Sequence, residues 1–140
     1  DDLTAKGFQF NQRSYATLIN GLCKIGKTTS AFKLVQMMER KGIKSHDVIY
    51  NTIIDGLCKL GNVNEAHQLC SEMTHRGMLP SLFTYNSLIH GYCSTGQLKE
   101  ATKLFHEMTL KDIYTYSIFI DALCKEGRII EAQTVFARMM

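Results

Sequence analysis

The amino-acid sequence repeats itself four times, and this repetition constrains the fold more than any other feature. The line YNTIIDGLCKLGNVNEA at residues 50–66 recurs as YATLINGLCKIGKTTSA from Tyr15, YNSLIHGYCSTGQLKEA from Tyr85 and YSIFIDALCKEGRIIEA from Tyr116. Its cysteine recurs at spacings of 35, 35 and 31 residues, as do a glycine and an alanine farther along each line. A fixed period of about 20 to 50 residues is typical of a solenoid, in which each unit buries its apolar face against the next.

Each unit contains two amphipathic helical patterns. In the first, apolar residues recur at i, i+3, i+4, i+7 and i+8, which places them on one face of a helix. Glycines between and after the patterns can adopt the left-handed conformation that ends a helix, and Asn62 with Glu65 resembles a reciprocal helix N-cap. We therefore predict an all-α fold, an α-solenoid of helix-turn-helix repeats. The expected core includes Tyr15, Leu18, Ile19, Leu22, Cys23, Ala31, Leu34, Val35 and Met38 in the first unit and the equivalent residues of the others, down to Tyr116, Phe119, Ile120, Leu123, Cys124, Ala132, Val135, Phe136 and Met139.

The two patterns divide the chain into a leading tail at 1–11 and four repeats at 12–46, 47–81, 82–112 and 113–140, of which the third is short and the fourth partial. Seven residues separate Met108 from Tyr116, against eleven between Met73 and Tyr85, so we expect the third unit to lack its glycine-containing connector and to turn more tightly. The chain opens in what resembles the end of a helix. We expect it to be a piece of a longer protein whose targeting segment lies elsewhere.

The composition fits a folded soluble domain, with 45% hydrophobic and 21% charged residues and a net charge of +3. This weak positive charge permits an anionic partner without requiring one. No apolar run is long enough to span a membrane. The five cysteines lack a CxxC pair and metal-ligand spacing, which indicates buried thiols rather than disulfides or a metal site. No nucleophile–base pair, phosphate loop or cofactor motif occurs, so we predict no catalytic site, cofactor or metal.

A second set of positions repeats on the opposite face of each first helix, which we expect to be solvent-exposed. Stacked units align this set into three rows along a groove, formed by flat apolar side chains, short side chains and lysines. Such a groove suits a single-stranded nucleic acid, because bases stack on the first row, base edges contact the second, and phosphates pair with the third. The rows are Arg13, Val48, Phe83 and Tyr114; then Ala16, Asn51, Asn86 and Ser117; then Lys24, Lys59 and Lys125, with Ser94 in the lysine row of the third unit.

The segment YNTIIDGLCKLGNVNEAHQLCSEM, with its period of 35 residues, resembles the pentatricopeptide repeat of the P type, and the resemblance extends over essentially the whole chain. It implies a right-handed superhelix that binds single-stranded RNA sequence-specifically, at one base per repeat. It also implies a plant mitochondrial or chloroplast protein that acts in the processing, editing, stability or translation of transcripts. The third unit resembles the 31-residue variant of the repeat, or a full-length repeat that carries a deletion.

The resemblance assigns roles to individual residues. In the family, the residue after the first-helix tyrosine selects the base together with the last residue of the same repeat. The resemblance assigns base stacking to Arg13, Val48, Phe83 and Tyr114 and backbone contacts to Lys24, Lys59 and Lys125. It implies that Asn86 with Asp112 selects U and that Asn51 with Ser81 selects a pyrimidine. It implies a purine for Ser117, whose partner lies beyond Met140. The pair of Ala16 and His46 departs from the code, and Asn11 is the last residue of the preceding repeat. The implied RNA target is N-Y-U-R.

A different function stays open at this point, because helical-hairpin solenoids also act as protein-interaction scaffolds. The chain could be a subunit of a large organellar ribonucleoprotein that contacts RNA and protein without reading sequence. The irregular pair of Ala16 and His46 and the short third unit favour this alternative. Further partners to consider are proteins of an organellar RNA-processing complex and a second copy of the chain, which would associate through exposed ends of the solenoid.

Overall fold

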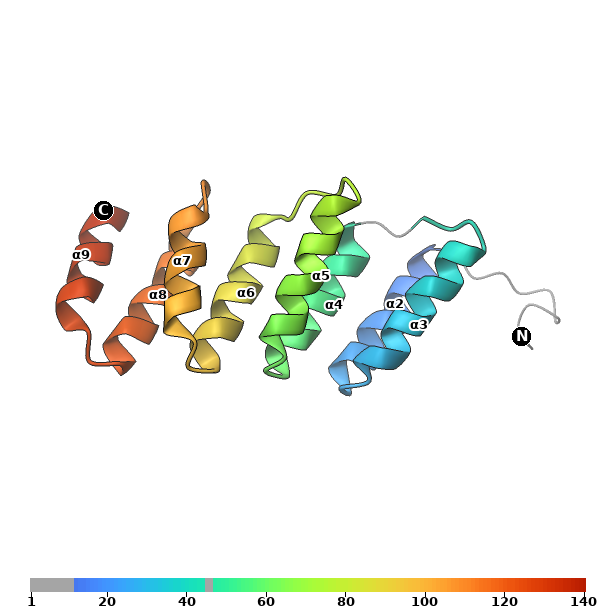
Figure 1. The fold of residues 1–140 in the computed structure, drawn as a ribbon, viewed down its shortest axis with the longest axis horizontal. Coiled ribbons are helices and arrows are strands. Elements are labelled where there is room, and N and C mark those ends of the chain that lie inside the picture. Colours follow the sequence, from blue (N-terminus) through green and yellow to red (C-terminus); the bar gives the residue numbers. More distant parts are fainter. Residues whose placement is uncertain (1–11, 45–46) are drawn as a thin grey trace.

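A computed structural model describes residues 12–44 and 47–140. The described chain forms eight helices that pair into hairpins, and Figure 1 shows these hairpins side by side in chain order. The prediction of an all-helical solenoid is therefore confirmed. The helices are α2 (Gln12–Lys24), α3 (Thr28–Arg40), α4 (Asp47–Lys59), α5 (Val63–His75), α6 (Leu82–Ser94), α7 (Leu98–Glu107), α8 (Ile113–Lys125) and α9 (Ile129–Met139). None of them has the length and apolarity that crossing a bilayer requires.

Each hairpin turns at a glycine in the left-handed conformation, as the sequence predicts. At the turn between α4 and α5, Gly61 has a φ of 83°, and the backbone N–H of Asn62 donates to the Leu57 carbonyl at 2.8 Å. This is the hydrogen bond by which a glycine C-cap satisfies the last carbonyls of a helix. The predicted side-chain cap at Asn62 is wrong, because its side chain forms no capping hydrogen bond. The junction between these two helices therefore depends on the backbone hydrogen bonds of the glycine turn and not on a side-chain cap.

The first helices of the hairpins form a continuous layer, in which α2 packs on α4, α4 on α6 and α6 on α8. Glycine allows two of these helices to approach closely: a Cβ atom added to Gly56 would lie 2.8 Å from Cys23 Cβ, and one added to Gly91 would lie 3.1 Å from Cys58 Cβ. The second helices pack within their own hairpins and against the next first helix where there is one. One surface of the first-helix layer therefore stays uncovered by helices.

The repeated apolar stripes form the core that the sequence predicts, and it is most complete in the second hairpin, where Ile53, Ile54 and Leu57 are buried. Corrections concern the two ends of the described helices. Leu18 on α2 and Phe136 on α9 are 48% exposed, and Cys124 on α8 is exposed. Each lies in a hairpin that has a neighbouring hairpin on one side only among the described helices.

The short third unit differs from the expectation in where its residues are lost. Helix α7 has 10 residues against 13 in α5, so most of the shortening falls in the helix and little in the connector. The terminal glycine is absent as predicted, and the backbone turns to an extended conformation at Met108. There the Lys111 ammonium donates to the Met108 carbonyl at 2.8 Å and lies 5.0 Å from the centre of the Phe105 ring. A cation thus satisfies a helix end that glycine closes after α3 and α5.

Candidate nucleic-acid interface

The uncovered surface of the first helices, called the groove face below, carries the residues that the sequence assigns to the three rows. Its apolar row begins the helices. Phe83 is 53% exposed and Tyr114 is 55% exposed, and Val48 and Arg13 are exposed as well. Large apolar side chains at the surface of a folded chain are informative where they recur in register. Here one exposed side chain of this row recurs at the equivalent position of every described first helix.

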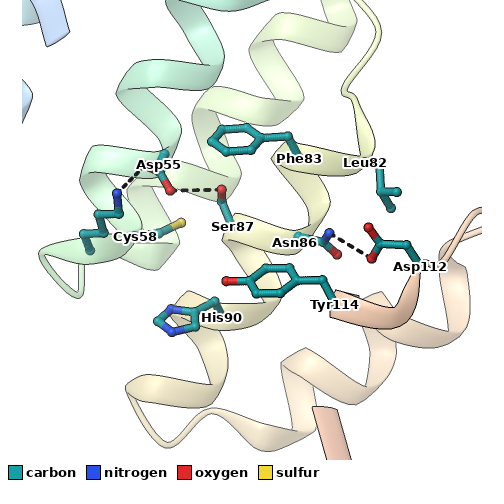
Figure 2. Close-up of a pocket in the computed structure, with 10 residues that line it drawn as sticks. Asp55, Cys58, Leu82, Phe83, Asn86, Ser87, His90, Asp112 and Tyr114 are labelled. Atoms are coloured by element: carbon teal, nitrogen blue, oxygen red, sulfur yellow. Dashed lines mark hydrogen bonds and ion pairs between the residues drawn. The ribbon is translucent and has the colours of Figure 1, made fainter. Parts of the chain in front are cut away.

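A cavity of about 520 Å³ opens on the groove face between α4, α6 and α8. Figure 2 shows Asn86 and Asp112 pointing toward each other, with the Phe83 ring on one side of them and the Tyr114 ring on the other. Ser87 and Asp55 lie farther along the same cavity. The cavity thus has two aromatic walls and hydrogen-bonding groups between them.

Asn86 is hydrogen-bonded on both sides of its amide. Its Nδ2 donates to Asp112 Oδ1 at 3.3 Å, and its Oδ1 accepts from the Thr115 hydroxyl at 2.5 Å. The sequence predicts an exposed Asn86, but it is 6% exposed because α8 packs over it. The hydrogen bond from the Thr115 backbone N–H is the main cause that lowers the pKa of Asp112, so this carboxylate is ionised at neutral pH. The predicted pair of Asn86 and Asp112 is therefore brought into direct contact.

The predicted pair of Asn51 and Ser81 is linked through a third residue. The Thr84 hydroxyl donates to Asn51 Oδ1 and lies 3.2 Å from Ser81 Oγ. Ser81 and Asp112 are also the N-cap residues of α6 and α8, each in a capping box with the threonine three positions on. The same two side chains thus begin a helix and border the groove face.

Some predicted residues are not brought together. Asn11 and His46 lie outside the described residues, so the structure places no partner beside Ala16, which is half-buried on α2. Ser117 lies exposed on α8 and lines a cavity of about 350 Å³ with His90, Tyr114 and Lys125.

Two lysines of the third row form ion pairs and are therefore only partly available to a ligand. Lys59 and Lys125 are well exposed, but each ammonium lies 2.9 Å from an aspartate four residues earlier, Asp55 or Asp121. The hydrogen bond to Asp55 raises the pKa of Lys59. Asp55 also accepts from the Ser87 hydroxyl of the next first helix at 3.1 Å. Lys24 is exposed, and Ser94 adds no charge.

Sequence reasoning missed the two threonines and the pairing of two lysines with Asp55 and Asp121. A signal for the threonines was present, because Thr84 and Thr115 both directly precede the repeated tyrosine, in FTYN and YTYS. The aspartates repeat as IIDGLC and FIDALC, one turn before a lysine. Among the described residues, no group of three or more histidine, cysteine or acidic side chains is arranged to hold a metal ion. The face can hold flat rings and form hydrogen bonds with their edges.

Sequence models of the PPR repeat match most of the chain. The model described as the PPR repeat family matches residues 45–94 and 80–125, and two further models of the PPR repeat match residues 6–39 and 114–140. No curated protein sequence matches the chain significantly.

Solved structures agree with the family models. The pentatricopeptide repeat protein PPR10 from maize superposes with a TM-score of 0.84 over 99% of this chain at 29% identity. The same protein in complex with an 18-nucleotide psaJ RNA element gives a TM-score of 0.85 over 96% of this chain at 31% identity. In both cases the chain spans 20% of the length of PPR10.

A more distant structure shares the fold alone. The PPR domain of protein-only RNase P 1 from Arabidopsis thaliana, crystallised in complex with tRNA, gives a TM-score of 0.76 at 14% identity, over 99% of this chain and 76% of that domain. The repeated sequence, the paired helices and the family models lead to one conclusion: the chain belongs to the PPR, or pentatricopeptide, repeat family.

Proposed function

We propose that the chain binds single-stranded RNA sequence-specifically along the groove face, with one base for each of the repeats bounded at 12–46, 47–81, 82–112 and 113–140. The observation that carries this proposal is the cavity in which Asn86 and Asp112 lie between the Phe83 and Tyr114 rings. Aromatic side chains stack on any base, at about 1–3 kcal/mol each. The RNA-bound state of PPR10, a similar protein, supports the choice of ligand.

The hydrogen-bonding groups of the third unit favour uracil. Asn86 Nδ2 supplies an N–H donor beside the acceptor oxygens of the Asp112 carboxylate. Uracil presents a carbonyl oxygen next to its N3–H, which complements this pair, whereas the unprotonated N3 of cytosine would face a carboxylate. In the second unit Ser81 replaces the carboxylate, and its hydroxyl can donate or accept. That unit accordingly accepts either pyrimidine.

In the first unit, Ala16 occupies the place of Asn51 and Asn86 and lacks a hydrogen-bonding side chain, and its expected partner His46 lies outside the described residues. Ser117 in the fourth unit carries a hydroxyl, and the family resemblance supports a purine there. The proposed target is therefore N-Y-U-R. The RNA-binding role belongs, on the same resemblance, to organellar transcript processing, editing, stability or translation in a plant mitochondrion or chloroplast. The chain itself acts as a binding module in this proposal, and other proteins of an RNA-processing complex would supply the chemistry.

The test is a fluorescence anisotropy titration of the chain with labelled RNAs that carry each base in turn at the third position, and with DNA of the same sequence. We expect tighter binding to RNA than to DNA, a preference for U, and loss of that preference in Asn86→Ala. Asn62→Ala is the matched control, since Asn62 lies exposed in a turn and its side chain forms no capping hydrogen bond. Equal binding of RNA and DNA together with an unchanged Asn86→Ala would overturn the proposal.

The same titration distinguishes RNA binding from the alternative role as a protein-interaction scaffold. A protein-binding role predicts neither a base preference nor a single-position effect of Asn86→Ala. The paired lysines favour this alternative to a degree, because Lys59 and Lys125 each lie against a carboxylate. The aromatic-walled cavity has no equivalent reason to exist on a scaffold, so we favour RNA.

A further inference from the structure

Two buried threonines occupy the same place in successive repeats. Thr84 on α6 and Thr115 on α8 are fully buried, and each hydroxyl lies against the carboxamide oxygen of an asparagine on the preceding first helix. The partners are Asn51 for Thr84 and Asn86 for Thr115. A hydroxyl beside a carbonyl oxygen must act as the donor, since that oxygen can only accept. In both pairs it is the carboxamide oxygen, rather than the NH2 group, that lies against the threonine.

The surroundings of Asn86 favour this orientation over the flipped one. Thr115 Oγ1 lies 3.2 Å from the Asp112 backbone N–H, from which it accepts, and its single proton is left for donation. Two acceptors compete for that proton, Asn86 Oδ1 at 2.5 Å and Asp112 Oδ1 at 2.7 Å. The Asp112 carboxylate already accepts from the Thr115 backbone N–H at 2.9 Å, which favours donation to Asn86. A flipped amide would place Asn86 Oδ1 against the Asp112 carboxylate, where two acceptors repel. Only one orientation satisfies every group.

The first junction between repeats lacks both members of this arrangement. Ile49 stands one 35-residue period before Thr84, and Ala16 stands one period before Asn51. Ile49 is 1% exposed, so the place of the buried hydroxyl is filled by an apolar side chain. The amide and the hydroxyl are present together at two junctions and absent together at the third. They behave as a unit.

We propose that Thr84 and Thr115 are positioning residues that fix the orientation of the base-reading carboxamides of Asn51 and Asn86. This inference rests on the proposed function, since it assigns a donor to the base edge only if these asparagines contact a base. With the oxygen held by threonine, each amide presents its N–H group to the groove. The threonine of one repeat thereby contributes to the base specificity of the repeat before it.

The test measures base preference at two positions of the RNA in parallel. Affinities of the chain for RNAs with U or C at the third position are compared between the native chain, Thr115→Val and Thr115→Ser. Valine has the shape of threonine without the hydroxyl, so the U-over-C ratio should fall toward one at the third position only. Serine keeps the hydroxyl and should retain the ratio. Thr102→Val, on the outer helix α7, is the matched control.

The outcomes separate this inference from the proposed function. If the native chain shows no base preference at the third position, the proposed function fails. If the native chain prefers U and Thr115→Val keeps the same ratio, the positioning role is overturned while RNA binding stands. An equal loss for both bases and at both positions also overturns it, because it would indicate that Thr115 only stabilises the start of α8. Thermal unfolding of each variant accompanies the titrations.

A gain-of-function pair provides a second, independent test at the first junction. Ala16→Asn alone introduces a carboxamide with no hydroxyl to hold it, whereas Ala16→Asn combined with Ile49→Thr restores both members. A new base preference at the first position in the double variant, and not in the single variant, supports the proposal. The same preference in both variants contradicts it.

Discussion

Lys59 Nζ lies 2.9 Å from Asp55 Oδ2, one turn earlier on α4, in the row of the groove face that RNA phosphates are proposed to follow. Lys125 and Asp121 repeat the arrangement on α8 at the same distance. Exposed ion pairs of this kind contribute about 0–1 kcal/mol, so a phosphate can compete with the aspartate for the ammonium. The aspartates therefore weaken the positive potential of the groove without blocking it.

The third unit offers a way to measure this effect, because Ser94 stands where the other units have lysine and His90 precedes it by one turn. Ser94→Lys adds an ammonium with no aspartate at that spacing. We expect tighter RNA binding and a steeper salt dependence, by about 0.7 in the slope of log K against log salt for one added phosphate contact on a single strand. Titrations at several salt concentrations measure it.

The control for this prediction is Ser71→Lys, which adds the same charge on α5, away from the groove face. A change in slope as large for Ser71→Lys as for Ser94→Lys would show that net charge, rather than a row of contacts, governs binding.

The aromatic platforms give a second prediction. Phe83→Ala removes one wall of the cavity that holds Asn86 and Asp112, and we expect RNA affinity to fall by about tenfold, within the range of 1–3 kcal/mol per stacked base. Phe136→Ala is the matched control, since this phenylalanine is similarly exposed but lies on the outer helix α9. Anisotropy titration compares the two. Equal losses in both variants would contradict a stacking role for Phe83.

Substitution by alanine should change the free energy of unfolding differently at Gly21 and Gly56, which occupy equivalent positions in the first and second repeats. An alanine Cβ at Gly56 would lie 2.8 Å from Cys23 Cβ, whereas one at Gly21 would have nothing within 4 Å. We expect Gly56→Ala to lower the free energy of unfolding by about 1–3 kcal/mol through overpacking between α2 and α4. Gly21→Ala should leave it unchanged or raise it by up to about 1 kcal/mol through helix propensity. Urea unfolding followed by circular dichroism measures both, and a stabilised Gly56→Ala would refute the close packing of these helices.

The fold and the rows of the groove face follow from the sequence because they depend on periodicity. Ile53, Leu57 and Gly61 recur at fixed spacing, and a fixed spacing on a helix determines which side chains share a face. The burial of Asn86 does not follow, because it depends on how closely α8 approaches α6. That distance is set by contacts between residues far apart in the chain, such as the hydrogen bonds that join Asn86 to Asp112, 26 residues away, and to Thr115, 29 residues away.

The exposed Cys124 illustrates a second limit. The pattern treats the cysteines at 23, 58, 93 and 124 as equivalent, and the first two are buried because the next first helix packs over them. Cys93 is only half-buried and Cys124 is exposed, since Ala122 replaces glycine on α8 and no described first helix follows it. A repeat pattern describes the interior of a solenoid, and its ends require the neighbours to be known.

The cysteines consequently predict a graded order of reactivity toward iodoacetamide. Burial, with Asp55 as a smaller contribution, raises the pKa of Cys58 to about 12, and burial raises the pKa of Cys93 to about 11. A raised pKa keeps a thiol protonated and unreactive at pH 8, because the thiolate is the nucleophile. We expect Cys124 to be alkylated first and Cys58 last, as followed by peptide mass spectrometry over time. In urea the five thiols should react at similar rates, and native Cys58 reacting as fast as Cys124 would show that α6 does not pack over it.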